Sequence, residues 1–291
     1  MVVVSVPDDL HCDISLAAIA AGLHVVCEKP LALTAAQAKG MYERAKRAGV
    51  KHMTYFTNRW LPSFRYVHHL VAEGFVGRCL TADFRYAGSW GRGADYRWRF
   101  DAARGLGALG DVGSHVIDMA RWLVGDVSAV CASLGFSHDR PGADGKPTQG
   151  ANDSARLLLE FANGCRGLVN ASLVSHAGGQ QMRVILDGEK GTIEIDASPR
   201  DGYRVYAGSH GDKDMAVQTI PEEFLRGVDQ KGPVMEQLRR VFTEHPVGCR
   251  EFVDAILEDR QVSPSFHDGW KAQEVMQAAL ESDRQRRFVT L

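Results

Sequence analysis

The segment His24-Val25-Val26-Cys27-Glu28-Lys29-Pro30 decides the fold class, because an apolar run stops there at two charges and a proline. The β-forming residues up to Cys27 predict a short buried strand. A proline disfavours helical geometry in the residue before it, so we expect Lys29 to be extended at the carboxyl end of this strand. Ligands bind at that end of open α/β sheets. An ordinary turn with a solvated lysine fits the same residues.

A similar strand end lies upstream. Residues 1–6 are apolar and stop at Pro7-Asp8, and residues 14–21 fit a helix that Gly22 ends. Strand, helix and strand within so short a segment predict a parallel βαβ unit, whose two strand ends open on one edge. Thr34 can cap a further helix over residues 35–48, and residues 51–56 predict a third parallel strand. Residues 1–57 are therefore predicted to form an α/β domain on a parallel sheet.

Residues 58–291 show a different order of elements. The pattern predicts several strands in series, which favours a mostly antiparallel sheet with flanking helices, an α+β domain. The expected helices cover residues 62–74, 112–124, 234–257 and 269–282. The expected strands cover residues 79–86, 127–136, 154–161, 165–173, 182–186 and 192–196.

Composition excludes several classes of protein. A formal net charge of −2 gives no electrostatic reason to expect nucleic acid or an anionic membrane as a partner. The 6 cysteines form no CxxC pair, which favours reduced thiols and a cytoplasmic location. No apolar stretch is long enough to span a bilayer.

Residues 105–110, Gly-Leu-Gly-Ala-Leu-Gly, match the spacing of a dinucleotide fingerprint. That fingerprint needs a buried strand before its first glycine. Charged and aromatic residues precede Gly105 instead, and Asp111 would place a carboxylate where a pyrophosphate needs bare amides. We interpret this motif as something other than a phosphate cradle.

Asp111 and His115 are four residues apart and are predicted on one face of a helix. A carboxylate beside an imidazole orients it and suits a general acid or base near neutral pH. A capping aspartate and a structural histidine fit the same spacing. No third ligand occurs at a recognisable spacing, so no metal site is predicted.

Together, the Pro7-Asp8 turn with His11, the Glu28-Lys29-Pro30 strand end and the Asp111/His115 pair resemble the Gfo/Idh/MocA family of NAD(P)-dependent oxidoreductases. The resemblance runs from residue 1 to the C-terminus. It implies an incomplete Rossmann domain over residues 1–57 and a substrate-binding and oligomerisation domain over residues 58–291. The cofactor would be NAD or NADP, and we expect a homo-oligomer formed through the sheet of the second domain.

The resemblance also implies a reaction, which is hydride transfer between nicotinamide and a sugar, inositol or related polyol. Its catalytic residues would be Lys29, Asp111 and His115. His115 would exchange the hydroxyl proton, Lys29 would hydrogen-bond the same oxygen, and Asp111 would orient His115. The cofactor contacts implied by the resemblance are Pro7, Asp8, His11, Glu28, Lys29, Pro30 and Arg59.

Two alternatives stay open for the residues around that site. Arg59 fits a surface salt bridge as well as a cofactor contact. The residues Trp90, Tyr96, Trp98 and Arg99 of a long loop fit either a sugar pocket or the packing of a domain junction.

Members of this family begin with a strand, a glycine fingerprint and a helix, and the next strand ends in the residue that selects NAD or NADP. The chain starts at a later strand, so that choice and the substrate are not readable. We expect either that the functional protein has residues before Met1, or that the chain is a truncated, non-catalytic sugar-binding or scaffold paralogue. The apolar strand at residues 2–4 would then have an unpaired edge, which favours association.

Overall fold

The computed structural model describes residues 1–175, 180–198 and 201–291, and it confirms the predicted fold class. A small parallel sheet comes first, in the order β1-β2-β3. Its strands are Val2–Val4, Val25–Cys27 and His52–Thr54, and the helices α1 (His11–Ala20) and α2 (Ala35–Ala48) connect them. β3 is shorter than predicted.

Helix α2 begins and ends where the sequence predicts. The Thr34 hydroxyl accepts a hydrogen bond from the Gln37 amide, and the Gln37 side chain accepts one from the Thr34 amide. Gly49 ends the helix with a φ of 65°, a left-handed conformation that glycine adopts without steric cost. Local capping therefore sets both boundaries of this helix.

The second sheet contains nine strands among the described residues, in the order β11-β10-β9-β8-β4-β7-β6-β5-β12. Only the central pair β4–β7 is parallel, and the other neighbours are antiparallel. Strands β10, β11 and β12 were not predicted. The strands are Cys79–Ala87 (β4), Val127–Gly135 (β5), Ser154–Phe161 (β6), Arg166–Ser172 (β7), Gln181–Gly188 (β8), Gly191–Ser198 (β9), Gly202–Ser209 (β10), Ala216–Val217 (β11) and Val289–Thr290 (β12).

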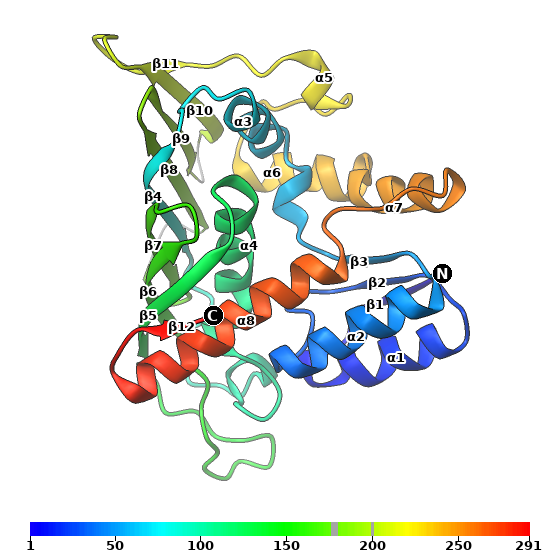
Figure 1. Cartoon of the computed structure of the whole chain (residues 1–291). Coiled ribbons are helices and arrows are strands. Elements are labelled where there is room, and N and C mark those ends of the chain that lie inside the picture. Colours follow the sequence, from blue (N-terminus) through cyan, green and yellow to red (C-terminus); the bar gives the residue numbers. More distant parts are fainter. Residues whose placement is uncertain (176–179, 199–200) are drawn as a thin grey trace.

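Helices cover one face of this sheet (Figure 1). The predicted continuous helix over residues 234–257 is wrong, because the chain breaks between α6 and α7 at Pro246, which has no amide to continue a helix. The helices are Pro62–Ala72 (α3), Ser114–Leu123 (α4), Glu222–Leu225 (α5), Val234–Arg239 (α6), Val247–Leu257 (α7) and Phe266–Gln285 (α8). No helix in these described residues has the length and apolarity to cross a membrane.

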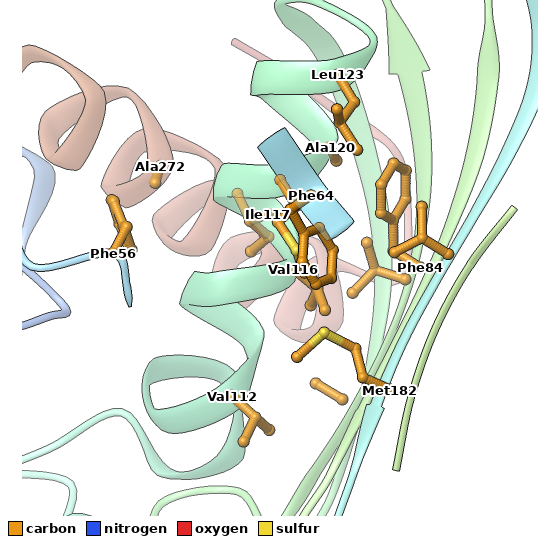
Figure 2. Packing of buried hydrophobic residues seen from close by; sticks show 14 of the residues in the cluster. Phe56, Phe64, Phe84, Val112, Val116, Ile117, Ala120, Leu123, Met182 and Ala272 are labelled. Atoms are coloured by element: carbon orange, nitrogen blue, oxygen red, sulfur yellow. The ribbon is translucent and has the colours of Figure 1, made fainter. Parts of the chain in front are cut away.

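Helix α4 lies at the centre of the largest hydrophobic core. Val116 and Ile117 are fully buried, and Figure 2 shows apolar side chains of α4 facing Phe84 and Met182 of the sheet. Helix α8 contacts α4, β3 and β5, so it packs between the two sheets (Figure 1). The position of α4 is therefore set by buried contacts with both the large sheet and α8.

A buried ion-pair cluster also joins these elements. Arg59, in the short turn after β3, donates to both carboxylate oxygens of Asp118 on α4, at 2.8 and 2.6 Å. It also donates to Asp268 of α8 at 3.0 Å and to the Ser263 hydroxyl at 2.8 Å. Since Arg59 and Asp118 are almost inaccessible to solvent, removal of one partner would leave the other charge buried.

We predict that Asp118→Ala lowers the free energy of unfolding by about 3 kcal/mol, because it leaves the buried guanidinium with one carboxylate instead of two. Urea unfolding measures this loss. The control is Asp126→Ala, which removes the exposed partner of Arg121 and should cost less than about 1 kcal/mol. Equal losses in the two variants would show that the cluster contributes no more than a surface pair.

Candidate active site

The structure brings the end of β2 and the start of α4 into contact. The Lys29 ammonium donates to the Asp111 carboxylate at 2.9 Å and to the Asp111 carbonyl at 2.8 Å. Both side chains are mostly buried. Lys29 follows β2 of the small sheet, whereas Asp111 lies in the turn before α4, and the two residues are 82 positions apart in the sequence. Lys29 is therefore held by two acceptors at the carboxyl edge of the parallel sheet.

Close backbone packing around the glycine-rich segment makes this contact possible. A Cβ on Gly107, whose φ is 61°, would lie 1.9 Å from the Asn152 carbonyl oxygen. The Asn152 side chain accepts from the Leu109 amide and donates to the Leu106 carbonyl, both at 2.9 Å. A 3₁₀ turn and a hydrogen-bonded turn precede Gly105, and no strand does in this described stretch. The glycines thus serve packing, and Asn152, which sequence reasoning missed, fixes the loop that carries Asp111.

The relation between Asp111 and His115 differs from the prediction. Asp111 lies in a single π-helical turn, Leu109–Gly113, and His115 lies in the first turn of α4. The i, i+4 rule assumes regular α-helical geometry, which this turn lacks. The Asp111 carboxylate instead accepts from Lys29 and, at 3.0 Å, from the Trp90 indole. Among the described residues no hydrogen bond links Asp111 to His115, so Asp111 orients Lys29 rather than His115.

His115 lies in an aromatic and nearly dry environment. Its ring lies 6.2 Å from that of Phe56 and 6.1 Å from that of Tyr86. Burial, with a smaller contribution from Lys29, lowers the pKa of His115 to about 3. The imidazole is therefore neutral at neutral pH, and the same two effects make it a weak base. Tyr86 was also missed, although strand alternation indicated that it faces inward.

Asp111 keeps its negative charge in the same environment. Burial acts to raise the pKa of its carboxyl, but the Lys29 ammonium outweighs this effect and holds that pKa well below its usual range. Arg99 lies 3.5 Å from the same carboxylate and stacks on Trp98. The site thus combines a fixed cation, an anion and a neutral base.

A cleft of about 360 Å³ opens beside Lys29. The ends of β1 and β2 form one wall, with Pro7, Asp8 and Glu28, and Trp98 with Arg99 forms the other. Burial raises the pKa of Asp8 to about 7, although Lys29 and Arg99 oppose this shift. An open carboxyl edge with hydrogen-bonding side chains fits the nicotinamide end of a dinucleotide.

Three residues predicted as cofactor contacts do not line this cleft. The His11 ring is fully buried, with its nitrogens 2.8 Å from the Pro30 carbonyl and 2.9 Å from the Val6 carbonyl, so it braces the two strand ends. Pro30 is buried against Gly110. The Arg59 guanidinium is committed to the buried cluster with Asp118, which corrects both the cofactor contact and the surface salt bridge.

No group of three or more potential metal ligands comes together within the ranges that the structure describes.

We predict that His115 makes stability depend on pH. The unfolded chain binds a proton at this residue below about pH 6.5, whereas the folded chain binds it only near pH 3, so stability falls as the pH falls between these values. Between about pH 7 and pH 5 the wild type should lose roughly 2 kcal/mol relative to His115→Asn. Urea unfolding at both pH values measures this difference. His245→Asn, at an exposed histidine, controls for the substitution, and parallel curves for wild type and His115→Asn would contradict the prediction.

Comparison with known proteins identifies the family to which the chain belongs. Residues 1–56 match the NAD-binding Rossmann fold of the oxidoreductase family GFO_IDH_MocA, and residues 68–291 match its C-terminal alpha/beta domain. The levoglucosan dehydrogenase of Pseudarthrobacter phenanthrenivorans is 33% identical over 98% of this chain and 78% of its own length. The scyllo-inositol 2-dehydrogenase (NADP(+)) IolW of Bacillus subtilis is 26% identical over 100% of this chain and 78% of its own. A solved structure of levoglucosan dehydrogenase in complex with NADH and levoglucosan has a TM-score of 0.86 at 29% identity, and the match covers 99% of this chain and 79% of that one. The chain therefore belongs to the Gfo/Idh/MocA family of oxidoreductases.

Proposed function

We propose that the chain is an NAD(P)-dependent dehydrogenase that transfers a hydride between nicotinamide and a carbinol carbon of a sugar, inositol or related polyol. The observation that carries this proposal is the Lys29–Asp111 pair beside neutral His115, next to the cleft at the carboxyl edge of the parallel sheet. The sugar and inositol substrates in the names of the relatives support the substrate class.

The cleft residues would hold the nicotinamide end of the cofactor. Pro7 supplies an apolar surface, and the carboxyl groups of Asp8 and Glu28 can accept hydrogen bonds from ribose hydroxyls. When bound there, the nicotinamide coenzyme supplies the hydride acceptor or donor. Because the pKa of Asp8 is about 7, this side chain can bind either as a carboxylate or as a neutral acid near neutral pH.

Three side chains have separate roles in moving the hydroxyl proton and stabilising the charge on the substrate oxygen. His115, whose Nδ1 makes no hydrogen bond within the described residues, accepts the hydroxyl proton of the alcohol as the carbinol carbon is oxidised, and returns it in the reverse direction. Lys29 donates a hydrogen bond to the same oxygen and stabilises its developing negative charge. Asp111 holds Lys29 in place through the ion pair. Trp90 and Arg99, which contact Asp111, present a ring and donors suited to a polyhydroxylated substrate.

We predict that Lys29→Met and His115→Asn each lower kcat by about 10²–10⁴-fold while the protein stays folded, since each removes one group that acts on the reacting oxygen. The assay follows reduction of NAD⁺ and NADP⁺ with levoglucosan and scyllo-inositol as substrates. Lys39→Met, at an exposed lysine of α2, is the matched control and should leave kcat unchanged.

Wild-type turnover in a folded Lys29→Met or His115→Asn variant would contradict the catalytic assignment. A wild-type chain that binds the sugar but neither coenzyme would instead support the alternative of a non-catalytic sugar-binding or scaffold protein.

We further propose a homo-oligomer that forms through the outer face of the large sheet. Cys131, Leu158 and Leu168 lie side by side in register on β5, β6 and β7. Leu158 is 52% exposed and Leu168 39% exposed, and these residues line a shallow hollow of about 310 Å³. None of the helices in the described ranges covers this face (Figure 1). A contiguous apolar patch of this kind is typical of a protein interface.

We predict that Leu158→Glu shifts the oligomer to the monomer, because it places a charge in the centre of this apolar face. Size-exclusion chromatography with light scattering measures the mass. Val217→Glu, at an exposed position on the edge strand β11, is the control and should leave the mass unchanged. A wild-type protein that is monomeric at micromolar concentration would refute the interface.

A further inference from the structure

A second cavity lies at the far end of α4 from the catalytic residues. Its volume is about 390 Å³, and residues of α3, α4, α5 and α7 line it. Figure 1 shows these helices on the covered side of the large sheet. Trp122, on its wall, lies about 10 Å along α4 from His115, because each helical residue rises about 1.5 Å. The cavity is therefore separate from the cleft beside Lys29.

Positive charge exceeds negative charge on the wall formed by α3, α5 and α7. Arg65 and Arg226 both line the cavity, and Glu251 is the single carboxylate among the lining residues. Glu251 is already shared, because it accepts from Arg226 at 2.7 Å and from Arg260 at 2.9 Å. Arg59 also lines the cavity, but its guanidinium is paired with Asp118 and Asp268.

Arg65 is the least compensated of these cations. Its guanidinium is half-buried, and in the described part of the chain its one hydrogen bond goes to the Phe224 carbonyl at 3.2 Å, with no carboxylate within 4.0 Å. Burial, followed by the charge of Arg226, lowers the pKa of Arg65 to about 10. Two like charges in a partly desolvated cavity are unfavourable unless an anion lies between them.

Aromatic groups complete the wall. The His68 ring stacks on Trp122 with centroids 4.2 Å apart and an interplanar angle of 10°. Burial lowers the pKa of His68, so at neutral pH this ring offers an N–H donor without adding charge. The rings of His69 and Phe224, whose centroids lie 5.1 Å apart, also line the cavity. The cavity therefore combines planar guanidinium cations, the neutral His68 N–H donor and flat aromatic surfaces.

We propose that this cavity binds a dianionic oxyanion of the phosphate or phosphate-monoester class between Arg65 and Arg226, with His68 as a further donor. Guanidinium groups match such oxyanions in charge and in the geometry of paired hydrogen bonds. A neutral sugar would leave Arg65 without a counter-charge, and a monocarboxylate offers the two guanidinium groups fewer acceptor oxygens than a phosphate does. The volume exceeds that of a phosphate ion and leaves room for an attached group against Trp122.

Isothermal titration of inorganic phosphate, sulfate and acetate into the full chain at low ionic strength tests the proposal. The two dianions should bind saturably at one site, and acetate at least about tenfold more weakly. Arg65→Gln and Arg226→Gln should each weaken phosphate binding at least about tenfold, whereas Glu251→Gln should strengthen it because a competing carboxylate is removed. The matched control is Arg78→Gln, whose exposed guanidinium pairs with Glu189 and which should change nothing.

Absence of saturable phosphate binding, or equal weakening by Arg78→Gln, would overturn the proposal, since general surface charge would then explain the binding. Arg226 is the more exposed of the two arginines, so Arg226→Gln decides the matter if Arg65→Gln does not fold. A hexose 6-phosphate that binds more tightly than inorganic phosphate assigns the cavity to phosphate monoesters, and the reverse order assigns it to free phosphate.

Discussion

The ion pair between Lys29 and Asp111 is the interaction on which the candidate site depends. It joins the carboxyl edge of the parallel sheet to the turn before α4, and both partners are mostly buried. Burial of each charge alone would be unfavourable, so the two segments are stable in this arrangement only together. The buried Arg59–Asp118–Asp268 cluster holds the same helix against β3 and α8 from its other side. The small sheet and α4 are thus fixed relative to one another at two charged contacts.

This arrangement also sets the protonation states in the site. Lys29 keeps Asp111 ionised, and together with burial it keeps His115 neutral. The same two effects oppose protonation of His115, so the proposed proton transfer depends on Lys29 stabilising the hydroxyl oxygen that loses the proton. The pKa of Asp8 near 7 follows from the same balance, since burial outweighs the nearby cations there.

Much of the candidate site could be predicted from local pattern. The strand ending at Lys29-Pro30 and the boundaries of α2 depend on neighbours in the sequence, such as a proline or a capping threonine, and the structure reproduces them. The interpretation of the glycine-rich segment also needed only its preceding residues. The role of Asp111 could not be predicted in this way, because the π-helical turn and the Asn152 contacts that create it depend on residues about forty positions away.

The sequence by itself therefore determined the α/β then α+β order, the position of Lys29 at a sheet edge and the family resemblance, because strand endings, caps and periodicity are set by residues close in the chain. Only the tertiary structure decided that Asp111 orients Lys29 rather than His115, that Arg59 and His11 brace the fold, and that Arg65 and Arg226 face one cavity. Those outcomes depend on which distant side chains are buried together, since burial selects the partner of each charge and no local pattern encodes that choice.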